Sequence, residues 1–187
     1  MTSTTTVALP SEVVTFWFGE TVRPLWFAAT AEFDQALRER FLATYRAAAA
    51  GERADWEITP EGALALVIVL DQFPLNMFRG RPKAFATETA ARGVAERAID
   101  RGLDQALTPE QQTFLYMPFM HSEDLADQER SVRLFQQPGL EQSLGFARHH
   151  QGLIRRFGRF PHRNAILGRA NTAEEIAYLA SPEAFLG

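Results

Sequence analysis

Apolar residues along this chain recur at helical spacing. Within residues 31–50, Phe33, Leu37, Phe41 and Tyr45 follow one another every four positions, which places them on one face of a helix. No segment shows the sustained alternation of apolar and polar residues that is typical of a half-buried strand. The pattern therefore predicts an all-α fold of seven to nine helices joined by short loops.

Two of these helices are predicted to end at prolines, because proline disfavours the helical conformation in the residue before it. Thr59 followed by a proline begins a nearly all-apolar helix, and we expect Pro74 to end that helix at Phe73. The sequence Thr-Pro-Glu-Gln at 108–111 is a capping box that begins another helix. We expect this helix to break before Pro118.

Caps and glycines bound the remaining helices. Ser122 is expected to cap a helix at about 123–136, and Thr172 with Glu175 forms a capping box for a helix at 173–180. Further helices, each closed by a glycine, are expected at about 11–18, 31–50, 84–101 and 139–157. The dipeptide Ser181-Pro182 begins a last half-turn.

Length and composition fit one domain with a sizeable core. The chain has 187 residues, of which 46% are hydrophobic and fifteen are Phe. No Gly- or Ser-rich linker interrupts it, so we expect a single helical domain over 1–187 with a disordered tail at 1–9. The net charge of −4 argues against broad adhesion to nucleic acid or to anionic lipid, although a local basic pocket is compatible with it.

Cysteine count and hydropathy narrow the chemistry and the location. The chain has no Cys, which excludes disulfides, thiolate zinc sites and cysteine nucleophiles. Its first ten residues lack the basic and apolar regions of a secretory signal. The longest apolar run, Ala63–Leu70, is far shorter than the roughly 20 residues that span a bilayer. These features predict a cytoplasmic protein.

The first of three polar junctions is the sequence LDQFPLNMFRGRP at 70–82. Asp71 follows a nearly continuous apolar run, and a carboxylate near a helix C-terminus faces the negative end of the helix dipole. A buried carboxylate needs a donor, and the candidates are Arg79, Arg81, Arg159 and Arg163. Asp71 either lines a site or ties two helix corners together by an ion pair.

The second junction is the sequence YMPFMHSEDLADQ at 116–128. An N-cap serine followed by acids in the first helical turn is ordinary helix chemistry, and it accounts for Ser122, Glu123 and Asp124. It does not account for His121, which is flanked by apolar residues. Gln128 shares a stripe with apolar residues, so we expect an inward-facing side chain that needs hydrogen-bond partners.

The third junction is the sequence RRFGRFPHRNAILGR at 155–169. Arg155 and Arg156 fall in a last helical turn, where cations are favoured. His150 lies on an apolar helix face and is expected to be a hydrogen-bonded core residue. A position at a helix end does not explain the polar residues that follow Gly158, which are Arg159, His162, Arg163 and Asn164. Arg169 is interpreted as another helix-end charge.

The three junctions are predicted to converge on a pocket at one end of the helical bundle. An apolar pocket with a few acids, amides, cations and imidazoles is the usual form of a small-molecule site. We expect no metal, because no HExxH motif occurs and His149 and His150 are adjacent rather than four residues apart. No cofactor is expected. The candidate ligand-binding residues are Asp71, Gln72, Asn76, Arg79, His121, Glu123, Arg159, His162, Arg163 and Asn164.

Two stretches of the chain echo each other. DQFPLNMFRG at 71–80 and GRFPHRNAILG at 158–168 share Phe-Pro, then an asparagine, then a glycine, with a one-residue insertion. The echo indicates either a weak helical-hairpin repeat or two similar ways of turning a corner.

Several longer motifs resemble a bacterial family of uncharacterised proteins, domain of unknown function 924. The motifs are FWFGE, LDQFPLNMFRG, FATE, YMPFMHSEDLADQ and RFGRFPHRNAILGR, and the similarity extends from about residue 11 to the end. The family is grouped with tetratricopeptide-like helical proteins, so the resemblance implies a superhelical bundle of α–α hairpins. The chain departs from the family at Leu75, where an Arg is usual, which puts any ligand role of that position in doubt.

Three functions are compatible with these observations. The first is binding of a small anionic metabolite, a phosphate or carboxylate, by the arginines and histidine of 159–163 with Arg79, because the planar guanidinium matches two oxygens at once. The second is a hydrolase that uses His121 or His162 with Asp71 or Glu123. The third is a tetratricopeptide-like adaptor that binds a peptide or protein partner.

Overall fold

The structure, a computed structural model, describes residues 6–185, and these residues form helices and turns without any strand. The predicted all-α class is therefore confirmed. The described residues fall into two compact units, one of residues 6–79 and 83–118 and one of residues 80–82 and 119–185. Part of the predicted tail, residues 1–5, lies outside the described residues, whereas the backbone N–H of Ala8 donates to Thr44 Oγ1 at 2.9 Å.

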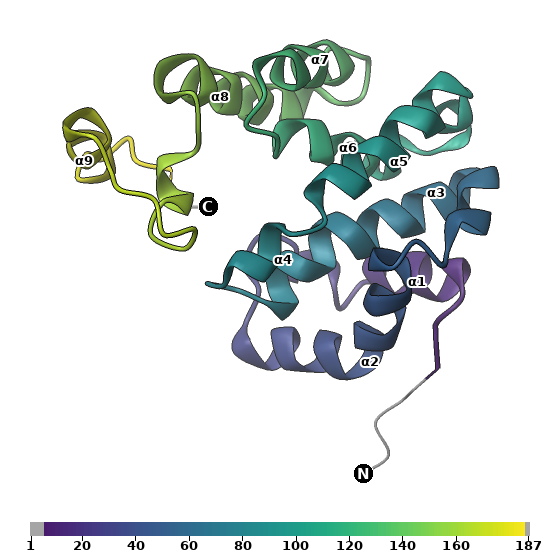
Figure 1. Cartoon of the computed structure of the whole chain (residues 1–187). Coiled ribbons are helices and arrows are strands. Elements are labelled where there is room, and N and C mark those ends of the chain that lie inside the picture. Colours follow the sequence, from purple (N-terminus) through teal and green to yellow (C-terminus); the bar gives the residue numbers. More distant parts are fainter. Residues whose placement is uncertain (1–5, 186–187) are drawn as a thin grey trace. The chain divides into compact units, whose positions relative to one another are not determined.

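The first unit contains α1 (Pro10–Trp17), α2 (Ala31–Ala49), α3 (Pro60–Val67), α4 (Phe73–Met77), α5 (Glu88–Asp100) and most of α6 (Pro109–Met120) (Figure 1). Helix α3 is its centre, packing against α1 and α5, while α2 packs against α4. The aromatic rings of Phe16, Trp17, Phe41 and Phe73 contact one another with centroid distances of 4.9 to 6.4 Å. The stripe predicted for α2 thus faces an aromatic core.

The prediction that α3 ends at Phe73 is wrong, because the helix continues through Pro74. A π-helical turn, Ile68–Gln72, joins α3 to α4, and the N–H of Phe73 bonds to the carbonyl of Ile68. Proline has no N–H to offer the carbonyl of Leu70, and the hydroxyl of Thr87 bonds this carbonyl instead at 2.6 Å. A side chain from a distant segment therefore satisfies the group that a proline leaves unpaired.

The helix predicted to break before Pro118 also continues, because α6 runs to Met120 with Pro118 inside it. Its start is as predicted: the N–H of Gln111 bonds to Thr108 Oγ1 at 3.3 Å, and Gln111 Oε1 accepts from the N–H of Thr108 at 3.0 Å. Local cap chemistry thus located the beginning of α6, whereas the residue-before-proline rule failed at its end.

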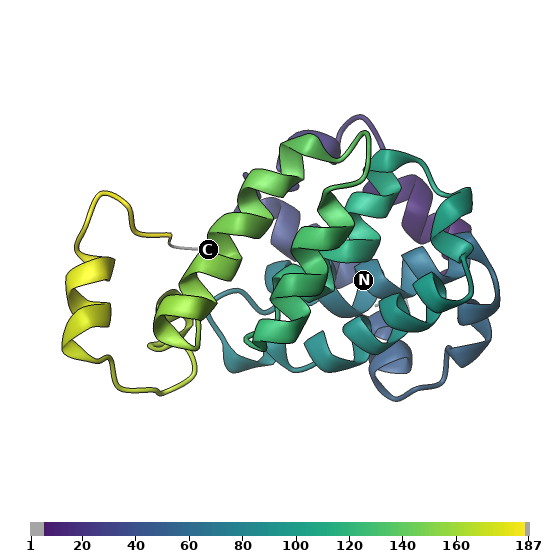
Figure 2. The same ribbon diagram turned by 90° about the horizontal axis from the view of Figure 1, so that it is seen from above.

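The second unit contains α7 (Leu125–Phe135), α8 (Glu141–Phe157) and α9 (Ala173–Leu179). Helices α7 and α8 pack side by side, as both views show (Figures 1 and 2). Asp124, not Ser122, is the N-cap of α7, since Asp124 Oδ1 accepts from the N–H groups of Ala126 and Asp127. Ser122 supports the turn by accepting from the N–H of Asp124 at 3.2 Å.

Other predictions for the second unit are confirmed. The capping box of Thr172 and Glu175 begins α9, and Gly158 ends α8 in the left-handed conformation at φ 70°. His150 is buried, with its Nδ1 2.8 Å from the carbonyl oxygen of Phe146. Gln128 is buried, and its Nε2 donates to the carbonyls of Met120 and Ser122 at 2.7 Å each.

Candidate functional site

The candidate ligand residues of the first junction are hydrogen-bonded within the first unit. Asp71 is buried, and Gln72 Nε2 donates to Asp71 Oδ2 at 2.6 Å. Arg79 Nε and Nη2 lie 2.7 and 3.1 Å from the two carboxylate oxygens of Asp34, and Nη2 also donates to Asn76 Oδ1 at 2.9 Å. Arg79, one of the donors considered for Asp71, therefore pairs with a carboxylate of α2.

The second and third junctions meet at Glu123, in the second unit. Glu123 Oε1 accepts from the backbone N–H of Phe160 at 2.8 Å and from Arg169 Nη2 at 2.9 Å, while Oε2 accepts from Arg169 Nη1 at 2.7 Å. Burial alone would raise the pKa of Glu123, but the hydrogen bonds from Arg169 and Phe160 outweigh it and lower this pKa. Glu123 is thus an ionised carboxylate whose two oxygens are both occupied.

A second fork pairing joins Arg159 to Glu175. Arg159 Nε and Nη2 lie 2.6 and 2.7 Å from the two oxygens of Glu175, and the N–H of Thr172 donates to Glu175 Oε2 at 2.7 Å. Mainly because of the bonds from Arg159, the pKa of Glu175 falls to about 2. One carboxylate therefore completes the capping box of α9 and neutralises the arginine that the sequence presented as a candidate ligand residue.

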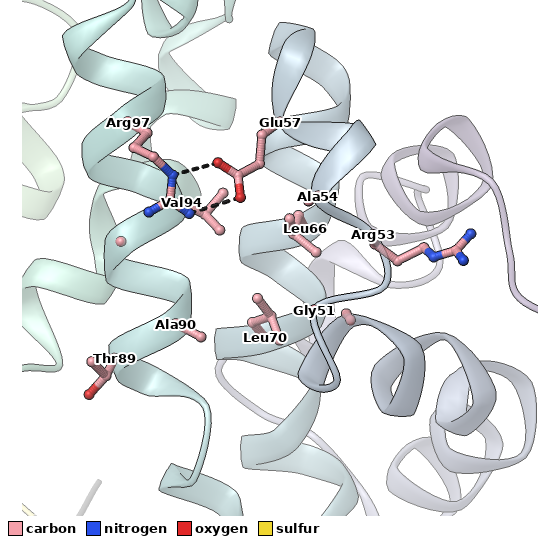
Figure 3. Close-up of a pocket in the computed structure, with 12 residues that line it drawn as sticks. Gly51, Arg53, Ala54, Glu57, Leu66, Leu70, Thr89, Ala90, Val94 and Arg97 are labelled. Atoms are coloured by element: carbon pink, nitrogen blue, oxygen red, sulfur yellow. Dashed lines mark hydrogen bonds and ion pairs between the residues drawn. The ribbon is translucent and has the colours of Figure 1, made fainter.

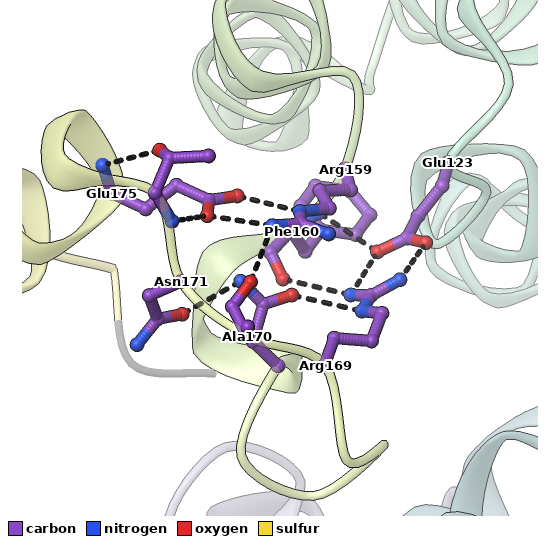
Figure 4. Close-up of polar contacts among 9 residues, drawn as sticks. Glu123, Arg159, Phe160, Arg169, Ala170, Asn171 and Glu175 are labelled. Carbon is purple, nitrogen blue, oxygen red and sulfur yellow. Dashed lines mark hydrogen bonds and ion pairs between the residues drawn. The ribbon is translucent and has the colours of Figure 1, made fainter.

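Asn164 connects the two fork pairings. Its Oδ1 accepts from Arg169 Nε at 2.8 Å, and its Nδ2 donates to Asn171 Oδ1 at 2.7 Å (Figure 4). We call the set Glu123, Arg159, Asn164, Arg169, Asn171 and Glu175 the corner network. A ligand anion at Arg159 or Arg169 would have to displace a carboxylate that already binds in the optimal fork geometry.

The sequence contained signals for two of the residues that the site prediction lacked. Glu175 was identified as a capping residue, and Arg169 was interpreted as a helix-end charge. Each also has a second role: Glu175 pairs with Arg159, and Arg169 pairs with Glu123. Local sequence patterns predicted the capping and helix-end roles. The two ion pairs could not be predicted in this way, because they depend on which segments the fold brings together.

His162 and Arg163 lie on a short 3-10 turn, Pro161–Arg163, beside Phe160. The Arg163 side chain is buried with its guanidinium carbon 4.7 Å from the ring centre of Phe160. Burial, the charges of Arg163 and Arg169 and the nearby His121 lower the pKa of His162 to about 4, although Glu123 opposes them. His162 is therefore a neutral imidazole at neutral pH.

Convergence of all three junctions stays a prediction. The candidate ligand residues of the first junction belong to the first unit, and those of the other two junctions belong to the second. Within the second unit, residues about 37 positions apart in sequence do come together, as the bond between Glu123 and Phe160 shows.

A cavity of about 200 Å³ lies in the first unit, between α3 and α5 (Figure 3). Its apolar floor is formed by Leu66, Leu70 and Val94. Small residues make most of its walls, namely Ala48, Gly51, Ala54, Ala90 and Gly93. We call it the α3–α5 cavity.

One end of the α3–α5 cavity is charged. Arg97 Nε and Nη2 donate to the two oxygens of Glu57 at 2.6 and 2.8 Å, and Arg101 Nη1 donates to the carbonyl of Glu57 at 3.3 Å. Mainly because of Arg97, the pKa of Glu57 is lowered. In Figure 3, Arg97 and Glu57 point toward each other, whereas the guanidinium of Arg53 extends away from the floor. Arg97 is thus the cation placed to meet a ligand.

Gly93 keeps this cavity open at the cost of helix stability. A glycine inside a helix destabilises it by about 1 kcal/mol relative to alanine. A Cβ at Gly93 would approach only the flexible guanidinium of Arg97, at 3.1 Å from Nη1. Helix packing therefore does not require a glycine at position 93. The effect of Gly93 is to leave room in the cavity beside Val94.

No group of three or more His, Asp or Glu side chains in the described part of the chain could hold a metal ion. Within the same residues, no helix is both long and apolar enough to cross a membrane.

The fold and the corner network define an all-α protein of two compact units in which ion pairs hold the turns around the short helix α9. The model of the bacterial protein family of unknown function DUF924 matches residues 13–183, and the chain belongs to this family. A solved structure, that of the protein of unknown function ATU0120 from Agrobacterium tumefaciens, is similar to it. That similarity has a TM-score of 0.87 and 43% sequence identity, and it covers 91% of this chain and 96% of the other. No curated protein matches the sequence.

Proposed function

We propose that this protein binds a small carboxylate with an apolar body, and that the α3–α5 cavity is the site. Three features support the proposal: a volume of about 200 Å³, a floor of Leu66, Leu70 and Val94, and a guanidinium at one end. The volume is below the ~300–1,000 Å³ of typical drug-sized sites, which favours a ligand of few heavy atoms.

The observation that carries the proposal is the pairing of Arg97 with Glu57 at the cavity mouth. Glu57 occupies Nε and Nη2 of this guanidinium at 2.6 and 2.8 Å and takes no bond from Nη1, which lies beside the cavity-lining Gly93 and is placed to donate to a ligand carboxylate. Of the other charged residues that line the cavity, Arg53 extends away from the floor, which leaves Arg97 as the cation at the site. Arg79, Arg159 and Arg169 are likewise each held by a carboxylate of their own, and none of the three lines the cavity.

The proposal keeps the anionic ligand predicted from the sequence and changes its site. It also includes a cytoplasmic location and a tetratricopeptide-like pairing of helices, for which the packing of α7 against α8 is the supporting contact. The corner network serves in this account to fix α9 and its adjoining turns.

The experiment is a calorimetric titration with hexanoate, with hexanol and hexylammonium as neutral and cationic controls of equal length. We expect binding of hexanoate only. Arg97→Gln removes the charge-assisted hydrogen bond to the ligand, and the loss of about 1.5–3 kcal/mol corresponds to roughly 10- to 100-fold weaker binding.

Arg159→Gln is the matched control, because it removes the charge of a guanidinium in the second unit and leaves the cavity unchanged. Equal hexanoate affinity in the wild type and in Arg97→Gln would contradict the proposal. Loss of binding in Arg159→Gln with retention in Arg97→Gln would instead indicate that the anion binds at the corner network.

A further inference from the structure

All four histidines of the chain lie together in the second unit. The rings of His149 and His150 are 6.1 Å apart between centroids, and Phe160 lies 5.4 Å from His150 and 5.6 Å from His162. His121 acts electrostatically on both His150 and His162. Residues from the α6–α7 junction, from α8 and from the turn at 161–163 therefore form one imidazole cluster.

The C-terminal segment Ser181–Phe185, which we call the strap, places one aromatic ring against this cluster. The centroid of Phe185 lies 5.7 Å from His149, 4.8 Å from His150 and 5.1 Å from His162, each in edge-to-face geometry. The strap is bonded to Tyr178 of α9 at both of its ends: the N–H of Phe185 donates to the Tyr178 hydroxyl at 2.8 Å, and the N–H of Ser181 donates to the Tyr178 carbonyl at 2.9 Å.

The enclosed imidazoles are held neutral. Burial is the main cause that lowers the pKa of His150 to about 3 and that of His162 to about 4. Nδ1 of His162 is enclosed and has no hydrogen-bond partner among the described residues, so a proton there would be poorly solvated. The strap and the neutral form of these rings therefore stabilise each other.

Some charged groups around the cluster oppose protonation of its imidazoles, and others favour it. Arg163 and Arg169 oppose a proton on His162, whereas Glu123 favours one but is held by Arg169. The other three imidazoles repel a charge on His150. On the strap side, Glu183 is the charged residue that lines a groove of about 430 Å³, together with Gly145, Phe146, His149, Ala184 and Phe185.

We propose that the strap is an acid-released latch, in which protonation of the imidazole cluster expels the ring of Phe185 and widens the groove beside Phe146. The direction follows from linkage. A histidine whose pKa is lower in the closed state binds more protons when the strap is open, so closure is favoured above the ordinary pKa of 6.5. Closure weakens as the pH falls from 6.5 toward about 4.

The test is hydrogen exchange of the full chain, read by mass spectrometry and corrected for the intrinsic pH dependence of exchange. Between about pH 7.5 and about pH 5.0, we expect the strap amides to lose at least roughly tenfold in protection while the amides of α8 keep theirs. Protection of the strap that is equal at both pH values, or that is lost together with that of α8, overturns the proposal.

Two variants make the test specific. His162→Phe keeps an aromatic ring and removes a titrating group, so its strap should stay more protected than the wild-type strap at low pH. Phe185→Ala should raise the pKa of His150 and His162 by at least about one unit in an NMR titration, because the closed state that disfavours their charge is lost. Unchanged pKa values in Phe185→Ala, or a wild-type pH dependence in His162→Phe, would each overturn the latch.

Discussion

Replacement of Glu175 by glutamine tests the role of the corner network. The Glu175 side chain is 2% exposed and accepts three hydrogen bonds, two from Arg159 and one from the N–H of Thr172. Glutamine keeps one acceptor oxygen, which can serve the two donors now at Oε2. Its amide group then faces Arg159 Nε, so one charge-assisted bond is replaced by a contact between two donors.

The expected loss of unfolding free energy is about 2 kcal/mol, the usual size of one hydrogen bond to a charged group. For a chain of this length, this loss lowers Tm by roughly 4–8 °C. All three tryptophans, Trp17, Trp26 and Trp56, lie in the first unit, so tryptophan fluorescence does not report on the corner. Thermal and urea unfolding should therefore be followed by far-UV circular dichroism.

The same variant has a defined pH dependence. The pKa of Glu175 is lowered from 4.5 to about 2 by folding, so between these values the unfolded chain binds more protons. The stabilisation by Glu175 is complete above 4.5 and is lost as the pH falls toward about 2. The difference between the wild type and Glu175→Gln should therefore shrink on acidification.

Glu174→Gln is the matched control, one residue away. Glu174 pairs with Arg156 at 2.7 Å, but its side chain is 58% exposed, and such pairs contribute at most about 1 kcal/mol. We expect the control to change Tm by less than half as much. Equal effects of the two substitutions would refute the reasoning that burial and the shared capping role make Glu175 special.

Three further predictions concern single contacts. Gly93→Ala should raise unfolding free energy by about 0.5–1 kcal/mol and weaken hexanoate binding, measured by urea unfolding and calorimetry, because the methyl group favours the helix and narrows the cavity. Thr87→Val should destabilise the chain by about 1–3 kcal/mol in urea unfolding, because it leaves the buried carbonyl of Leu70 without its donor. Asp124→Ala should cost about 1 kcal/mol in urea unfolding by removing the α7 cap, and an equal or larger effect of Ser122→Ala would contradict the cap assignment.

Local chemistry explains which parts of the fold could be predicted. The capping boxes at Thr108 and Thr172 and the terminal glycine of α8 depend on residues within one turn of each other, so the sequence contains all the atoms involved. The helix ends predicted at Pro74 and Pro118 failed for the opposite reason. At Pro74, the carbonyl of Leu70 is bonded by Thr87, seventeen positions away, and no local rule contains that contact.

The candidate site shows the same limit. Sequence patterns identified Arg159 and Glu123 as candidate ligand residues and Glu175 as a capping residue, but they could not show that Glu175 lies 2.6 Å from Arg159. The α3–α5 cavity had no sequence signal beyond its small residues, since alanine and glycine within helices have many causes. Its volume depends on the approach of α5 to α3, which is a tertiary property.

The most direct test of the proposed function is a methyl NMR titration with hexanoate. The account predicts saturable shifts for the methyl groups of Leu66, Leu70 and Val94, which form the cavity floor, and unchanged signals for Leu153 and Ile154 in the core of the second unit. Shifts confined to Leu153 and Ile154, or no saturable shift at the cavity floor, would contradict it.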